Sequence, residues 1–421
     1  MSSKGVVSNR NAGSGINETI TELNSSILDF ERWLERNGPS SYDPYDIWGT
    51  RYGLFSRRVY YKKGKLGVPL IAPLLLMEIL WPGLRGLFVA KERFTTADGQ
   101  LAMAFLNLYG LDQDPTHLAK ARKLCEDLLA SSVKGYSGHC WGYPFHWQNN
   151  TGLWRKNTPY ITTTPYAFGA FLNLFSATGE TRYREAAISV AKFVHDDLHD
   201  TPVGADAAAS SYSPNDSGKV INASAYRAWV LFEAAYKLGV ESYLTKAHRN
   251  LNFILQNQRA DGAWLYALDS KGEAFIDHFH TCFVLKNLWK INQHLQSEAI
   301  TGAIRRGYDY YRRELFDAED QPKSFAIQPR TQLAKLEMYN MAEAITLGAL
   351  LAEDIPEAFA LAQKLAHRLR VNYQLRAGYF VTRVFTGGWR HTLPFLRWPQ
   401  SQLFYSLTNL LVSAKRKSAA H

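Results

Sequence analysis

Three ionisable side chains lie close together in the segment Phe275–Thr281. Asp277, His278 and His280 fall where a helix is expected to begin, a position at which the helix dipole favours a carboxylate. A carboxylate beside an imidazole suits proton transfer, because histidine titrates near neutral pH. A metal site is less well specified, because the spacing supplies no fourth ligand. Asp277 is equally suited to cap the helix, so a catalytic and a capping role are both open.

Other loops supply carboxylates that could act with this segment. Glycoside hydrolysis needs two opposed carboxylates about 5–9 Å apart. Asp261, Asp277 and Glu337 are the candidates for that pair. Hydrolysis of a glycosidic bond is therefore one chemistry to be tested.

Proton removal from a sugar carbon is the second chemistry. A uronate lyase or epimerase needs a base beside the C5 proton and a cation on the sugar carboxylate. The candidate bases and cations are His146, His278, His280 and Tyr339 with Arg383 or Arg390. A third chemistry, isomerisation at C2 by paired histidines, uses the same residues, as in sugar 2-epimerase toroids.

Aromatic side chains are unusually frequent, at 13 % of the residues. Their planar faces can stack on sugar rings, although many are also expected to fill the core. The candidate substrate-binding residues are the aromatic and cationic side chains Trp141, Tyr143, Trp147, Trp264, Tyr266, Tyr339, Arg383, Trp389, Arg390 and Trp398.

These loops precede helical stretches that recur about every 60 residues. The stretches are Leu101–Tyr109, Ala167–Phe175, Tyr226–Lys237, Thr281–Lys290, Ala342–Leu351 and Gln402–Ser413. Each of the first five is apolar on nearly every face and is followed by a helix with a one-sided apolar stripe, the pattern of an inner and an outer helix. The sequence therefore predicts an all-α fold, an α/α toroid ((α/α)6 barrel) of about six helical hairpins whose loops meet at one mouth.

One outer helix is missing from this count. The helix predicted at Thr19–Arg36, or the apolar segment Val68–Leu80, could pack beside the last inner helix and close the ring. We expect residues 1–16 to form a disordered tail and residues 17–421 a single domain. In that domain, residues 17–92 close the ring and residues 93–414 carry the repeats.

The net charge of +10 indicates an acidic partner, such as an anionic saccharide, a lipid-linked phosphate or a membrane face. Nucleic acid is not expected, because there is neither a run of five basic residues nor a nucleic-acid motif. No cofactor is expected, because no phosphate-binding glycine motif is present. Segment Met1–Asn17 lacks the apolar core of a signal peptide, and Val68–Leu80 is interrupted before it reaches a membrane-spanning length. We expect a cytoplasmic protein with peripheral contact to the inner membrane or to polysaccharide assembly proteins.

Two resemblances bear on function. Gln258–Trp264 resembles the repeat of prenyltransferase and squalene-cyclase toroids, but only one good copy is present and the acidic Asp-x-Asp-Asp motif is missing. Terpene cyclisation is therefore the least favoured functional hypothesis. The strings Trp141–Gln148 with Thr158–Tyr166, and Asp261–Asp269 with Phe275–Lys290, resemble helical-toroid proteins of bacterial exopolysaccharide and capsule biosynthesis clusters, which are distantly similar to six-hairpin glycosidase-like toroids. That resemblance implies work on a polysaccharide or a lipid-linked glycan.

Two classes of function follow. The first is an enzyme (hydrolase, lyase or epimerase) acting on a glycan in surface polysaccharide biosynthesis. The second is a glycan-binding scaffold without catalysis. In either case, the loops before the second, fourth, fifth and sixth repeats are the densest in aromatic and ionisable residues, so we expect the site on that side of the mouth.

Overall fold

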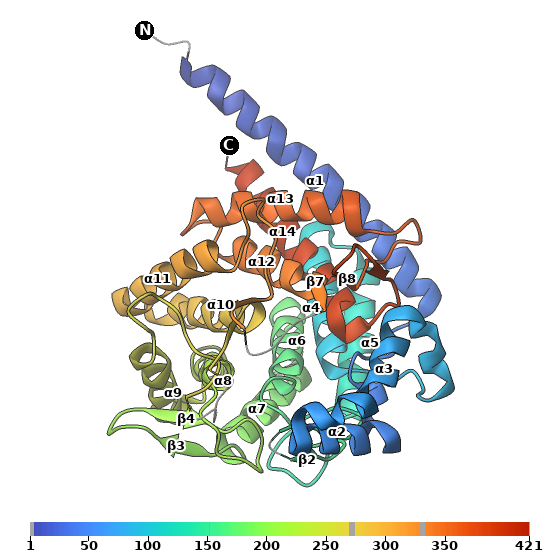
Figure 1. The fold of residues 1–421 in the computed structure, drawn as a ribbon. Helices are drawn as coiled ribbons and strands as arrows, with labels where there is room; N and C mark the ends of the chain where they lie inside the picture. The colour runs from blue at the N-terminus through green and yellow to red at the C-terminus, as the bar shows by residue number, and fades with distance from the viewer. Residues whose placement is uncertain (1–3, 151, 269–273, 329–332, 421) are drawn as a thin grey trace.

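Six inner helices form a closed ring, and each is backed by an outer helix (Figure 1). The computed structural model describes residues 4–150, 152–268, 274–328 and 333–420, with side chains from residue 15 onward. The inner helices are α4 (Thr95–Asp112), α6 (Thr164–Thr178), α8 (Ile221–Leu238), α10 (His278–Leu295), α12 (Met338–Leu350) and α14 (Ser401–Ala419). The outer helices are α5 (Pro115–Ala130), α7 (Thr181–Asp196), α9 (Leu244–Gln256), α11 (Glu298–Glu314), α13 (Pro356–Tyr373) and α1 (Lys4–Asn37). The all-α toroid of six hairpins is thereby confirmed.

Burial follows the two patterns read from the sequence. Every residue of α12 from Met338 to Ala349 is buried, because this helix is covered on both sides. By contrast, α11 buries Ile300, Ala303, Ile304 and Gly307, which repeat every three or four residues on one face. Inner helices therefore carry the core, and outer helices separate it from solvent.

Helix α1 supplies the sixth outer helix. It packs on α14, where the ring of the fully buried Phe30 lies 5.0 Å from that of Phe404. It also begins at Lys4, inside the segment for which a disordered tail was expected. The other candidate for closure, Val68–Leu80, is helix α3 and packs instead on α2 (Arg51–Lys63), outside the ring.

Glycines end two of the inner helices. Gly179 and Gly239 take left-handed φ angles of 72° and 78° directly after α6 and α8. Gly110, by contrast, lies inside α4. That helix continues to Asp112, and Gln113 takes the left-handed conformation with φ 57°.

Short antiparallel strand pairs join the loops at the mouth. The strands are β1 (Trp147–Gln148) with β2 (Leu153–Trp154), β3 (Asp200–Pro202) with β4 (Ala208–Ser210), β5 (Ile276–Asp277) with β6 (Phe325–Ile327), and β7 (Ala334–Glu337) with β8 (Arg383–Phe385) and β9 (Arg390–His391). Pairing of β5 with β6, and of β7 with β8, ties the loops of successive repeats together. Residues 329–332, between β6 and β7, lie outside the described residues.

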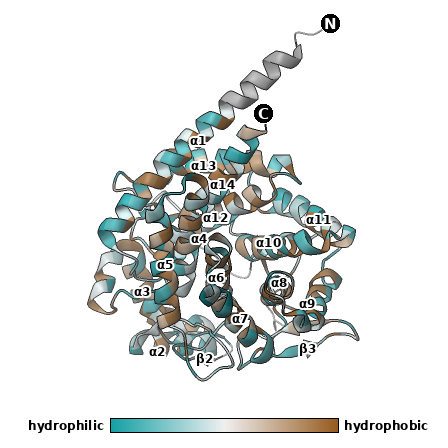
Figure 2. Cartoon of the chain, turned by 180° about the vertical axis from the view of Figure 1, so that it is seen from behind, coloured by the Kyte–Doolittle hydropathy of each residue, from teal (hydrophilic) through white to brown (hydrophobic). Residues whose placement is uncertain are grey.

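A small N-terminal unit sits beside the mouth. It comprises η1 (Asp46–Gly49), α2, η2 (Gly64–Gly67), α3 and η3 (Pro82–Leu87). Arg85, fully buried, forms ion pairs with Asp46 and Glu78 and donates to the Asp43 carbonyl oxygen at 2.7 Å. Two further short helices are η4 (Glu241–Tyr243) and η5 (Leu396–Gln400), the latter leading into α14. In Figure 2 the α2–α3 unit lies at the edge of the molecule.

We predict that Phe30→Ala lowers the free energy of unfolding by about 3–5 kcal/mol, because it leaves a cavity at the α1–α14 seam. Leu28→Ala, at a residue 44 % exposed on the same helix, is the matched control and should change it by less than about 0.5 kcal/mol. Urea unfolding followed by circular dichroism measures both. Equal effects of the two substitutions would contradict the packing of α1 as an outer helix.

Candidate active site

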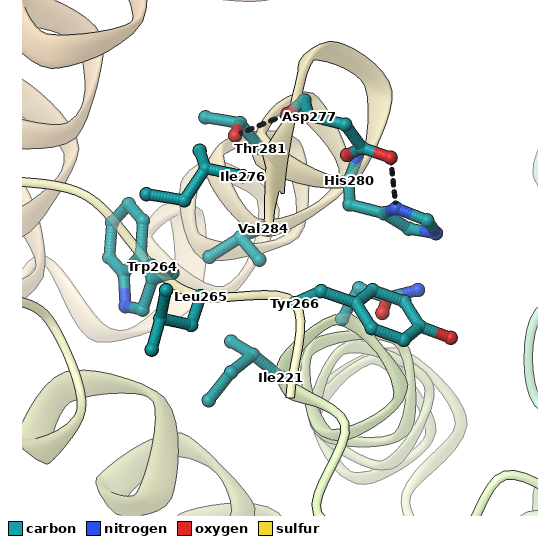
Figure 3. A pocket seen from close by; sticks show the side chains of 10 residues that line it. Ile221, Trp264, Leu265, Tyr266, Ile276, Asp277, His280, Thr281 and Val284 are labelled. Carbon is teal, nitrogen blue, oxygen red and sulfur yellow. Dashed lines mark hydrogen bonds and ion pairs between the residues drawn. The ribbon is translucent and has the colours of Figure 1, made fainter. Parts of the chain in front are cut away.

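Asp277 and His280 form a hydrogen-bonded pair at the start of α10 (Figure 3). Asp277 is the N-cap residue, and its Oδ1 accepts the backbone N–H of His280 at 3.0 Å. Its Oδ2 lies 2.7 Å from Nδ1 of His280. A carboxylate in this place accepts a hydrogen bond from Nδ1–H, so the neutral imidazole carries its free lone pair on Nε2. The capping role and the pairing role of Asp277 therefore coexist.

The pair lines a narrow cleft between α8 and α10. Tyr266 lies across from the imidazole, with ring centroids 4.6 Å apart, and Figure 3 shows its hydroxyl pointing the same way as the outer ring nitrogen of His280. Asn222, also lining the cleft, is buried, and within the described residues neither atom of its amide group finds a hydrogen-bond partner. The cleft holds about 10 Å³, the room of one water molecule. It thus brings a base and an unsatisfied amide to one small polar opening.

An aromatic wall formed by Phe279, Tyr339 and Trp398 continues from His280 toward the centre of the toroid. The ring centroid of Phe279 lies 5.3 Å from those of Tyr339 and Trp398, and the latter two rings stack with centroids 3.7 Å apart. Burial raises the pKa of Tyr339 well above its usual value, so the phenol stays neutral and does not serve as the base. Tyr339, which is 3 % exposed, and half-buried Trp398 thus form an aromatic stack beside Phe279.

Arg397 joins the loops around this wall. Its guanidinium pairs with buried Asp43, with Nη2 2.8 Å from Oδ1. The same group lies 4.7 Å from the ring centroid of Tyr143 and 5.7 Å from that of Trp398. The ring centroid of Trp147 lies 6.0 Å from that of Tyr143. We call Tyr143, Trp147 and Trp398 the aromatic collar. Predicted binding residues from the second and sixth repeats therefore meet at the mouth.

Glu337 and Arg383 contact each other rather than opposing Asp277. Arg383 Nε lies 3.3 Å from Glu337 Oε1 across the β7–β8 ladder. Arg383, one of the two arginines expected to bind a sugar carboxylate, is thus already paired with Glu337.

Four predicted binding residues are held by hydrogen bonds to backbone carbonyl oxygens. Trp141 and Trp264 are buried, and their indole N–H groups donate to the carbonyl oxygens of Leu128 at 3.0 Å and Ile254 at 2.9 Å, although Trp264 also lines the cleft beside His280. Trp389 is 56 % exposed and donates to the Ile79 carbonyl oxygen, whereas Arg390 donates to the carbonyl oxygen of Asn372 near the C-terminal end of α13. The first two stabilise the core, and the last two hold the β8–β9 hairpin against its neighbours.

Two predicted catalytic residues belong to surface loops. Asp261 is exposed, accepts the Ala263 N–H at 3.1 Å and pairs with Arg259, so it shapes the turn before Trp264. The exposed His146, directly before β1, accepts at 3.1 Å the backbone N–H of Lys156, which follows β2. Neither residue contacts Asp277 or His280.

His278 faces away from the mouth. It is fully buried beside α11, where Nε2 lies 2.7 Å from the Tyr311 hydroxyl and Phe316 packs at 5.2 Å. Burial lowers its pKa to about 3, so the ring is neutral at physiological pH. This histidine has a structural role, in contrast to the prediction.

The sequence-based prediction missed a polar layer deeper in the ring. The hydroxyls of Tyr166 and Tyr226 lie 2.9 Å apart, and Glu343 pairs with Lys286. Lys290 lies 3.8 Å from the Trp229 ring centroid, and burial, followed by repulsion from Lys286, lowers its pKa to about 7. The sequence feature that could have indicated this layer is the presence of charged residues inside helices that are otherwise apolar on every face.

Metal chemistry finds no ready-made site in the described part of the chain. No three His, Cys, Asp or Glu side chains come together there. At the mouth, His280 can transfer a proton through Nε2 while Asp277 holds its Nδ1.

Comparison with known proteins identifies the fold. No protein-family model matches the chain, and no curated protein matches it in sequence. An unsaturated glucuronyl hydrolase specific for heparin aligns over 95 % of this chain and 97 % of its own, with TM-score 0.61 and 11 % identity. A sugar epimerase from a ruminal bacterium (TM-score 0.59, 11 % identity, 77 % and 88 % covered) and a GH76 α-mannanase from Bacteroides thetaiotaomicron (0.57, 11 %, 78 % and 88 %) are also similar. These six-hairpin toroids share the architecture of this chain.

The hydrogen bond between Asp277 and His280 can be tested without a substrate, through the tautomer of His280. We expect nitrogen NMR at neutral pH to find His280 as the Nδ1–H tautomer, and Asp277→Ala to remove that preference and lower stability by about 0.5–2 kcal/mol through loss of the cap. Asp277→Asn keeps a good capping side chain and should cost less stability. A dominant Nε2–H tautomer in the unaltered protein would refute the assignment of Nε2 as the base.

Because His278 is buried in its neutral form, we expect the free energy of unfolding to depend on pH. Below the unfolded-state pKa of about 6.5 the unfolded chain binds a proton that the folded imidazole, with a pKa of about 3, does not bind. The contribution of His278 to the free energy of unfolding is therefore complete above pH 6.5. It falls as the pH drops toward 3, by up to about 1.4 kcal/mol per pH unit. Urea unfolding between pH 7 and pH 4 should show a shallower slope for His278→Asn. Parallel curves for the two proteins would contradict this account.

Proposed function

We propose that the protein is a carbohydrate-active enzyme that moves a proton on a sugar carbon, as an epimerase or a lyase does. The observation that carries the proposal is the 2.7 Å contact between Asp277 Oδ2 and His280 Nδ1, which leaves Nε2 as the base at the mouth. Asp277 orients the imidazole and stabilises the imidazolium that forms when Nε2 accepts a proton. The unsatisfied amide of Asn222 is a donor for the negative charge that develops on the sugar carbonyl or carboxylate.

Hydrolysis is less well supported, because it needs a protonated carboxylic acid facing a second carboxylate. In the described residues around the mouth, the carboxylates of Asp277, Glu337 and Asp43 each contact a basic side chain. Each of these carboxylates is therefore already engaged by that basic side chain. Burial raises the pKa of Asp98 to about 6, but that carboxylate is held by Arg93 beside α5.

The aromatic side chains at the mouth favour a saccharide as the ligand. The partly exposed rings of Trp398, Tyr143 and Trp147 offer flat faces for stacking on sugar rings. The similar structures are named as a glucuronyl hydrolase, an epimerase and a mannanase. With the net charge of +10 and the resemblance to exopolysaccharide and capsule proteins, these features support an anionic or lipid-linked glycan in cytoplasmic polysaccharide assembly as the substrate.

The test is turnover of the host's lipid-linked repeat unit, with products followed by mass spectrometry and proton NMR. We expect His280→Asn and Asp277→Asn to lower kcat about 10²- to 10⁴-fold, and Trp398→Ala mainly to raise KM. His367→Asn is the matched control, because His367 is 60 % exposed on the outer helix α13 and should leave kcat unchanged.

Two outcomes would count against the proposal. Full activity of His280→Asn would remove the assigned base. Tight binding of the glycan without turnover under all conditions would instead favour the glycan-binding scaffold.

A further inference from the structure

The N-terminal unit carries an unusual concentration of exposed apolar side chains. In the described part of the chain, more than half of the exposed large hydrophobic residues fall between Tyr52 and Phe88. The most exposed are Leu66 at 79 %, Leu87 at 76 %, and Trp81 and Phe88 at 60 % each. Patches of this kind on a folded protein mark interaction sites.

Most of these side chains come from two consecutive elements. On α3 the exposed residues Pro69, Pro73, Leu76 and Leu80 recur every three or four positions, so they share one face. Buried Glu78 lies on the opposite face. Trp81, Leu84, Leu87 and Phe88, in and beside the following η3, are exposed as well. Helix α3 lies outside the ring of inner helices in both views (Figures 1 and 2), and the described residues leave these side chains exposed.

The same unit carries a concentration of positive charge. From Arg51 to Lys91 the sequence has eight Lys or Arg residues and a single carboxylate, Glu78, which is buried against Arg85. The exposed cations are Arg51, Arg58, Lys62, Lys63, Lys65 and Lys91. Among the residues that the structure describes, none of these six forms an ion pair with a carboxylate.

We propose that the α2–α3–η3 unit docks on the surface of an anionic lipid bilayer, with the apolar face in the headgroup region and the cations of the unit on acidic lipids. Apolar area and adjacent basic residues together are what interfacial binding requires. A second copy of the chain fits less well, because a two-fold contact would press the same cations against each other. The unit lies on the surface and does not cross it, since in the described ranges no helix is long and apolar enough to span a bilayer.

Docking places the candidate active site close to the lipid. Arg57 of α2 donates to the Gln148 carbonyl oxygen of β1 at 3.3 Å, and Arg85 of η3 contacts Asp43, the partner of Arg397. The docking unit is thereby connected to the aromatic mouth through hydrogen bonds and ion pairs. A bilayer contact stands independently of the chemistry at His280, and its test requires no substrate.

The test is co-sedimentation of the full chain with vesicles of phosphatidylcholine containing about 30 % phosphatidylglycerol, compared with pure phosphatidylcholine. We expect binding to the anionic vesicles that weakens with salt. Neutralising three cations (Lys62→Gln, Lys63→Gln, Lys65→Gln) should weaken it on the order of a hundredfold, at about fivefold for each cation. Replacing three apolar residues (Leu76→Gln, Leu80→Gln, Leu84→Gln) should weaken it at least about tenfold.

The matched control replaces exposed apolar residues elsewhere, Ile327→Gln and Val371→Gln, and should bind as the unaltered chain does. Thermal unfolding checks that every variant remains folded. Failure to bind anionic vesicles at low salt, or binding unaffected by both triple variants, would overturn the proposal. So would a concentration-dependent dimer in ultracentrifugation that the apolar variant dissociates while vesicles bind neither protein.

Discussion

The buried ion pair between Asp43 and Arg397 holds the mouth of the toroid together. The two residues are 354 positions apart, one ahead of the N-terminal unit and the other in the last loop before α14. Arg397 also lies over Tyr143 of the second repeat, and the Asp43 carbonyl oxygen accepts from Arg85. Loss of either partner would leave a buried charge unpaired, at a cost of about 3–5 kcal/mol. Three distant segments are therefore positioned by one contact, and the aromatic collar depends on it.

The ring itself was predictable because its cause is local. Inner helices must be apolar all round and outer helices apolar on one side, and both patterns can be read in the chain. The loops were less predictable, since in an extended segment neighbouring side chains point to opposite sides. Trp264 and Tyr266, two residues apart, both line the cleft, but the Trp264 indole is buried and donates to the Ile254 carbonyl oxygen, whereas the Tyr266 ring lies 4.6 Å from that of His280.

The same limit applies to the paired histidines. Residues two apart on a helix point in nearly opposite directions, so His278 and His280 cannot both face the mouth. Sequence spacing shows that they diverge but not which one faces inward. That choice depends on where Tyr311 of α11 packs, a contact between distant parts of the chain. Lys286 and Glu343 were overlooked for the related reason that their partnership is formed only when α10 and α12 become neighbours.

We propose that His280, held by Asp277, transfers a proton at a sugar carbon, and proton NMR of the glycan turned over in deuterium oxide tests this step. We expect one carbon-bound hydrogen beside a carbonyl or carboxylate to exchange with solvent or to be lost, and His280→Asn to abolish this. Cleavage with addition of water that leaves every carbon-bound hydrogen in place would rule out proton transfer by His280.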